Sequence, residues 1–366
     1  MENFLNEQQW NAVTKAIKEL SRDDSPSACW HYTTLSALNA IIKDSLEKVN
    51  HFKVNYFNTA TFWASNIRYL NDEQEFRDGI LKLSEYEEKD IVDTCMDNVY
   101  LISFCGDGDL LSQWKYYGKE SGIAVKFNLN YVRYKYWKEI EQKLESHDDP
   151  LITIAGVEPK RKDDEQTRPI KVKYKDEEKV KYYGKLKDMS EISGVPSLIS
   201  NLFVPFCKHS GFSEENESRL VFYAHQFGVY KIGNRVTVPD IVYNLGKSTV
   251  KPALQVHMEV DDTRNLIDQI VVGPGYNQNL VFNALIHMFD RSHYHFFDIK
   301  DKIPEDDKKD GDNKSLPLEE FLKCKSDFLV HRVDIKTQND KTQTRLAYKC
   351  ENGIVIMKSS IPFRGD

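Results

Sequence analysis

Helical and strand-like patterns of apolar and polar residues are intermixed along most of the chain. Apolar positions within residues 4–20 recur at helical spacing and predict an N-terminal helix. Residues 28–42 begin as a strand and continue as a helix, for which Thr33 or Thr34 supplies the N-cap. Residues 59–65 have the β-branched and aromatic content of another strand, and a helical pattern follows them.

Further strands and helices follow without regular alternation. The expected strands cover residues 98–105, 122–128, 217–224, 253–260, 267–274 and 293–299, and a helix is expected at 275–289. No internal repeat is visible. The pattern predicts an α+β fold with a mixed or antiparallel central sheet flanked by helices.

Polarity changes along the chain suggest its domain organisation. The expected regions are an N-terminal helix (1–25), an α+β domain (26–300), a linker (301–320) and a small β-rich C-terminal region (321–366). Within the domain, the charged stretch 138–190 is interpreted as an insertion or a flap. Turns at Asn339–Asp340 and Asn352–Gly353 would connect the C-terminal strands.

Composition narrows the class of protein. A net charge of -7 argues against a protein that coats nucleic acid non-specifically, although it allows a local basic groove. The six cysteines include no CxxC pair, so neither a disulfide framework nor a zinc site is indicated. No apolar run reaches the roughly 18 residues of a membrane helix, and the N-terminus lacks an apolar core. A cytoplasmic location without a membrane partner is expected.

The first candidate group lies where the first strand meets its helix. On a strand, His31 and Thr33 point to one face and Tyr32 and Thr34 to the other. A histidine and a hydroxyl on one face can hold a ribose or a carboxamide by directional hydrogen bonds. The alternative is a capped helix beside a core histidine.

Two further stretches combine polar and aromatic groups. Arg68 could bind a phosphate through its fork of donors, just before Asn71 or Asp72 as a helix N-cap. Gln113, Trp114 and Tyr117 could stack on and orient a flat ring. The alternatives are a cap with a surface charge and the ordinary packing of two large aromatic side chains.

The most informative stretch is 206–223. Glu215 and Glu217 lie two residues apart at the start of a strand, and Arg219 continues the row. A carboxylate beside a sugar can stabilise an oxocarbenium ion, and Lys208 or Arg219 could hold a carboxylate or phosphate. The alternative is an edge strand protected by charges.

Two weaker signals favour structural roles. The Gly-Pro-Gly turn at 273–275 lacks the pattern of a phosphate-binding loop. His293 and His295 share a strand face but have no partner at metal-ligand spacing, so no metal is expected.

Together, four short motifs resemble an uncharacterised, mostly bacterial domain-of-unknown-function family over about residues 29–290. The motifs are Tyr32-Thr33; Leu70-Asn71-Asp72 with Glu75; Ser103-Phe104 with Trp114 and Tyr117; and Lys208, Phe212, Glu215, Glu217 and Arg219. The opening strand is also similar to that of ADP-ribosyltransferase-like domains, especially bacterial toxins that modify DNA. A second NAD-binding motif in the middle of the chain is not identified.

That resemblance implies roles for individual residues. In the wider superfamily a first-strand His and hydroxyl bind the nicotinamide–ribose part of NAD, and a later Glu is catalytic. His31 and Thr33 would bind NAD, Glu217 or Glu215 would be catalytic, and Arg68 would contact phosphate or carboxamide. The candidate catalytic residues are therefore Glu217, Glu215 and Arg219. The candidate NAD contacts are His31, Tyr32, Thr33, Arg68, Asn71, Gln113, Trp114, Tyr117 and Lys208.

The expected function is an NAD-consuming enzyme, either an ADP-ribosyltransferase or an NAD glycohydrolase, acting as a bacterial toxin or antiphage effector. NAD is the expected substrate, the acceptor is a nucleic acid, a protein or water, and the C-terminal region would bind a partner protein. One alternative is a non-catalytic module that senses a nucleotide or phage component. Another is a nuclease or nucleic-acid binder that uses the basic stretch 159–190. The enzyme hypothesis expects His31, Thr33 and Glu217 to line one cleft.

Overall fold

The chain divides into two compact units that interleave along the sequence. The computed structural model describes residues 7–52, 56–70, 73–87, 99–117, 122–129, 132–135, 153–155, 168–190, 192–223, 229–232, 235–237, 241–245, 250–261, 263–290, 315–323, 331–336 and 342–362. Unit 1 comprises residues 1–27, 61–104 and 129–259, and unit 2 comprises 28–60, 105–128 and 260–366. The sequence led us to expect regions that follow one another along the chain. Each unit instead combines three separate segments, because strands distant in sequence pair with one another.

Unit 1 contains a mainly antiparallel sheet and a group of helices. Its helices are α1 (Glu7–Asp23), η1 (Ile67–Tyr69), α4 (Glu73–Leu83), α8 (Asp176–Asp188), α9 (Pro196–Phe203), η4 (Val204–Phe206) and η5 (Ser210–Glu215). Its strands are β2 (Thr59–Asn66), β3 (Val99–Phe104), β5 (Arg133–Lys135), β6 (Thr153–Ala155), β7 (Ile170–Lys171), β8 (Ser218–Tyr223), β9 (Val229–Ile232), β10 (Arg235–Thr237), β11 (Ile241–Leu245) and β12 (Val250–Glu259). The strand order is β11-β12-β2-β3-β8-β7, with β5 on β12, and β10-β9-β6 form a separate sheet.

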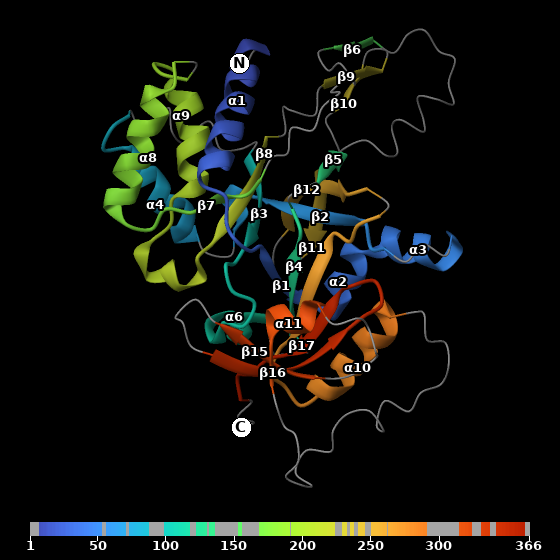
Figure 1. The fold of residues 1–366 in the computed structure, drawn as a ribbon. Helices are drawn as coiled ribbons and strands as arrows, with labels where there is room; N and C mark the ends of the chain where they lie inside the picture. The colour runs from blue at the N-terminus through green and yellow to red at the C-terminus, as the bar shows by residue number, and fades with distance from the viewer. Residues whose placement is uncertain are drawn as a thin grey trace, which may run out of the picture. The chain divides into compact units, whose positions relative to one another are not determined.

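The core of unit 1 lies among α1, α4, α8 and α9, which group beside β3, β7 and β8 (Figure 1). Val13, Leu83 and Leu198 are completely buried there. Tyr182 and Leu186 of α8 belong to the same cluster, and β7 pairs with β8. Residues 170–188 are therefore integral to this unit, whereas the charge of the stretch suggested an insertion. The buried residues of α8 recur at helical spacing, and this spacing places the helix against the core even though charged residues lie between them.

Unit 2 is built on a second seven-stranded sheet. Its strands are β1 (Trp30–Thr34), β4 (Gly122–Phe127), β13 (Ile267–Val272), β14 (Leu316–Pro317), β15 (His331–Lys336), β16 (Thr342–Lys349) and β17 (Val355–Lys358). Its helices are α2 (Leu35–Ile41), α3 (Lys43–Phe52), α6 (Leu111–Tyr117), α10 (Gln278–Phe289) and α11 (Leu318–Lys323). The strand order is β1-β4-β13-β17-β16-β15-β14.

The C-terminal strands continue this sheet. β17 pairs in parallel with β13. β16 and β15 follow β17 in antiparallel pairs (Figure 1). The β-rich C-terminal segment is thus part of unit 2 and not a separate small region. Phe321, Val333 and Met357 pack in the same buried cluster as Trp30.

Helices together with mixed and antiparallel sheets confirm the predicted α+β class. The turn at Asn352–Gly353 is also confirmed, with Gly353 at a φ of 92° that favours glycine. The strand expected at 293–299 and the turn at Asn339–Asp340 lie outside the described residues. Within the described ranges, no helix has the length and apolar character needed to cross a membrane.

A side-chain cap fixes the junction between β1 and α2. The Thr34 hydroxyl accepts a hydrogen bond from the Ala37 N–H at 3.2 Å. We expect Thr34→Ala to lower the free energy of unfolding by about 1 kcal/mol, because one helix N–H loses its partner. Urea denaturation would measure this, with Thr34→Ser as the control that keeps the hydroxyl. Equal stability of Thr34→Ala and the wild type would contradict the capping role.

Candidate functional site

A tight turn in unit 1 concentrates charged side chains at the start of β8. Residues 204–206 and 210–215 form the 3₁₀ helices η4 and η5, and Asn216 then takes a left-handed conformation with φ 43°. Asparagine tolerates this conformation better than most residues do. The turn delivers Glu217 to the beginning of β8, facing Lys208.

Glu217 is the centre of a buried ion-pair network. Arg219 donates from Nε to Glu217 Oε1 at 2.8 Å and from its second terminal nitrogen to Oε2 at 3.0 Å. Lys208 Nζ also donates to Oε2, at 2.9 Å. The side chains of Glu217 and Arg219 are only 3% and 1% exposed. Both carboxylate oxygens of Glu217 are therefore engaged by cations.

Glu215 extends the network towards the surface. Lys208 Nζ donates to Glu215 Oε2 at 2.7 Å and lies 4.8 Å from the centroid of the Phe212 ring. The Glu215 side chain is 15% exposed, five times the exposed fraction of Glu217. We call Lys208, Phe212, Glu215, Glu217 and Arg219 the charge cluster. Its members are the five residues of the last sequence motif.

Neighbouring groups fix the cluster in place. The Tyr174 hydroxyl accepts from the Glu217 N–H at 2.8 Å. Arg219 also donates to the carbonyl oxygen of Pro205 at 2.7 Å. β8 lies between β3 and β7, so the interpretation of these charges as the guard of an edge strand is wrong.

Burial and ion pairing shift the pKa values in opposite directions. Burial raises the pKa of Glu217, while Lys208 and a hydrogen bond with Ser103 oppose that rise. Burial lowers the pKa of Arg219 to about 9, which still leaves it protonated at neutral pH. For Lys208, burial lowers the pKa, but Glu217 and Glu215 outweigh it and the net pKa is raised. The cluster thus combines two basic and two acidic side chains, whose formal charges cancel.

The first-strand residues lie in unit 2, where Tyr32 has a clear structural role. The Tyr32 hydroxyl donates to the Asp107 carbonyl at 3.0 Å and accepts from the Leu110 N–H at 2.8 Å. Thr33 is buried, and the His31 ring lies edge-on to Phe127 at 6.5 Å between centroids. β1 and β8 belong to different sheets.

Trp114 packs in the core of unit 2. Its ring meets Tyr32 edge-on at 4.8 Å, and its indole N–H donates to Asp109 Oδ1 at 2.7 Å. Arg345 pairs with the other oxygen of Asp109 at 3.1 Å. Trp114 therefore has a packing role in unit 2. Gln113 is buried on the same short helix.

The structure describes the remaining candidate NAD-binding residues only in part. Arg68 lies in η1, and its N–H is capped by the Asn66 side chain at 3.0 Å. Asn71 lies outside the described residues, and Tyr117 ends α6 with its side chain outside them. Among the described residues, no group of three or more His, Cys, Asp or Glu side chains is placed to hold a metal ion.

Sequence reasoning missed Tyr174 and Ser103 as neighbours of Glu217. Tyr174 stands in the charged stretch, with no spacing that links it to residue 217. Ser103 was noted as part of a motif, and the register of β3 with β8 places it opposite Arg219. That register depends on pairing across more than a hundred residues, which no local pattern specifies.

One comparison with known proteins gives a match. Residues 113–220 match the family model described as "Protein of unknown function (DUF2971)". The prediction of an uncharacterised domain family is thereby confirmed. The DUF2971 match is narrower than the expected span of 29–290: it includes the whole charge cluster and leaves out β1. No curated protein and no solved structure matches the chain significantly.

Proposed function

We propose that this protein is an NAD-consuming enzyme, an ADP-ribosyltransferase or an NAD glycohydrolase, with the charge cluster as its catalytic centre. The observation that carries the proposal is the pair Glu215 and Glu217 held by one lysine, within 2.9 Å, inside the DUF2971 match. Paired carboxylates fixed in a largely buried setting suit the cleavage of a glycosidic bond.

The two carboxylates take different parts in this proposal. Glu215 is the more exposed of the two, with 15% of its side chain accessible against 3% for Glu217. It therefore faces the substrate as the catalytic residue. Glu217 is a positioning residue, because its carboxylate holds both Lys208 and Arg219.

The reaction breaks the bond between ribose C1′ and the nicotinamide nitrogen, and the electron pair leaves with nicotinamide. The Glu215 carboxylate stabilises the oxocarbenium-like sugar and orients the attacking hydroxyl or water. A new bond forms between C1′ and that oxygen, and its proton passes to Glu215 or to solvent. Removing one electrostatic contact that stabilises a transition state lowers kcat by a factor of about 10²–10³.

The remaining roles follow from the resemblance. Arg68, which lies in unit 1 with the charge cluster, is proposed to contact the phosphate or carboxamide of NAD. The acceptor is a nucleic acid, a protein or water, and a partner protein binds the C-terminal strands. The proposed setting is that of a cytoplasmic toxin or antiphage effector.

The test is release of nicotinamide from NAD by the purified chain, followed by chromatography. We expect turnover by the wild type and a kcat at least about 10-fold lower in Glu217→Gln, because two buried cations lose a counter-charge. Glu217→Asp keeps the charge and should recover part of that kcat. No nicotinamide release by the wild type, with or without protein and nucleic-acid acceptors, would refute the proposal.

A second candidate is a non-catalytic module that senses a nucleotide. The observation in its favour is that both oxygens of Glu217 are already engaged and the formal charges of the cluster cancel. This candidate predicts that NAD raises the melting temperature without any release of nicotinamide. The nucleic-acid hypothesis gains no support from α8, whose four lysines are matched by four acidic residues.

A further inference from the structure

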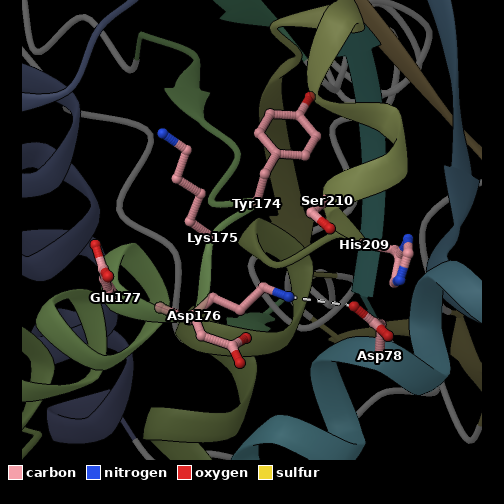
Figure 2. A pocket seen from close by; sticks show the side chains of 8 residues that line it. Asp78, Tyr174, Lys175, Asp176, Glu177, His209 and Ser210 are labelled. Atoms are coloured by element: carbon pink, nitrogen blue, oxygen red, sulfur yellow. Dashed lines mark hydrogen bonds and ion pairs between the residues drawn. The ribbon is translucent and has the colours of Figure 1, made fainter.

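A cavity of about 550 Å³ lies beside the charge cluster in unit 1. It is open to solvent and is lined by Tyr174, by the start of α8, by Asp78 of α4 and by the segment that follows Lys208 (Figure 2). This volume is within the usual range of about 300–1,000 Å³ for small-molecule sites. Its lining is polar, which indicates a polar ligand.

Hydrogen-bond donors gather at one end of the cavity. Lys179 is buried, and its ammonium donates to Asp78 at 3.2 Å, the dashed line in Figure 2. His209 accepts the Gly211 N–H on Nδ1, so its other ring nitrogen carries a proton when the ring is neutral. The Ser210 side chain lies beside His209 in this view. Lys179, His209 and Ser210 therefore offer three donors to an anionic oxygen.

Those donors are available within the described part of the chain. Asp78 is the only described side chain bonded to the Lys179 ammonium, which has three N–H donors. The Ser210 hydroxyl and the second ring nitrogen of His209 likewise have no described partner. Phosphate oxygens suit such a convergent set of donors.

The rest of the lining favours hydroxyl groups. Asp176 and Glu177 are exposed at the rim and accept hydrogen bonds only. Together with Asp78 they make three acidic residues in the lining, and the basic residues are two, Lys175 and Lys179. The lining would therefore attract a free anion only weakly. A phosphate carried by a sugar satisfies both ends, because its hydroxyls donate to the carboxylates.

We infer that this cavity binds a phosphorylated ribose, with the phosphate at Lys179, His209 and Ser210 and the sugar hydroxyls at Asp176 and Glu177. The site adjoins the charge cluster directly. Lys208 precedes His209 in the chain, and Tyr174 bonds to Glu217. The inference does not depend on NAD consumption, because it concerns binding alone.

Isothermal titration calorimetry of the full chain, without NAD, tests the site with four probes: ribose 5-phosphate, AMP, ribose and inorganic phosphate. We expect ribose 5-phosphate, AMP or both to bind at least about 10-fold more tightly than ribose or phosphate, because only they engage both ends. Binding of AMP alone would identify a nucleotide as the source of the sugar phosphate. Absence of binding by both, or equal affinity for inorganic phosphate, would overturn the inference.

Matched variants locate the binding. Lys179→Met and Ser210→Ala should each weaken the affinity about 10-fold, since each loses a donor to phosphate. Ser210 is exposed, so its variant keeps the fold even where Lys179→Met does not. Lys181→Met is the control, an exposed lysine of α8 outside the cavity lining. Unchanged affinity in Ser210→Ala, or an equal loss in Lys181→Met, would contradict the proposed site.

Discussion

Arg219→Met is expected to lower the free energy of unfolding by about 3–5 kcal/mol, the usual effect of removing one partner from a buried ion pair. Arg219 is 1% exposed and makes two hydrogen bonds to Glu217 and one to the Pro205 carbonyl. The methionine fills most of the space but leaves Glu217 and a carbonyl without these donors. Denaturation by urea, followed by tryptophan fluorescence, measures the loss.

Two controls separate the ion pair from the loss of any arginine. Arg22 is exposed in the same unit, so Arg22→Met should change the free energy of unfolding by less than about 0.5 kcal/mol. Glu217→Leu combined with Arg219→Met removes both charges and should cost less than Arg219→Met alone. If Arg219→Met is as stable as Arg22→Met, the buried pair does not hold this part of the unit together.

The sequence predicted Glu215, Glu217 and Arg219 as one row along a strand entry, and the motif added Lys208. In the structure Glu215 ends η5 and Asn216 is left-handed, so it is the shared contact with Lys208 that brings Glu215 to Glu217. The structure brings all four within hydrogen-bond distance of a neighbour in the set. The predicted cap of the helix after β1 is also observed, at Thr34.

Non-local pairing explains what the sequence left unpredicted. The many charged residues of α8 made its sequence resemble an exposed insertion. Tyr182 and Leu186 are buried because they pack in one cluster with residues of α9, and this contact is not visible in the local sequence. The parallel pairing of β17 with β13 joins segments separated by more than eighty residues, which no turn signal predicts. For the same reason the bond from Glu217 to Tyr174 could not be inferred from either stretch alone.

Glu215→Gln is expected to lower kcat/KM for NAD by about 10²–10³-fold, because an amide cannot stabilise the positive charge of the oxocarbenium-like sugar. The change removes one charge from a side chain that is 15% exposed and keeps the shape of that side chain. Lys208 keeps its pair with Glu217 in this variant. The loss should therefore lie mainly in kcat, with little change in the melting temperature.

The most direct test of the proposed catalytic role is the rate of nicotinamide release by Glu215→Gln against Glu214→Gln. Glu214 is exposed and adjacent, so its variant has the same change of charge without touching the charge cluster. We predict that Glu214→Gln keeps the wild-type rate, while Glu215→Gln falls by about two orders of magnitude or more. Equal rates of nicotinamide release by the two folded variants would contradict the assignment of catalysis to Glu215.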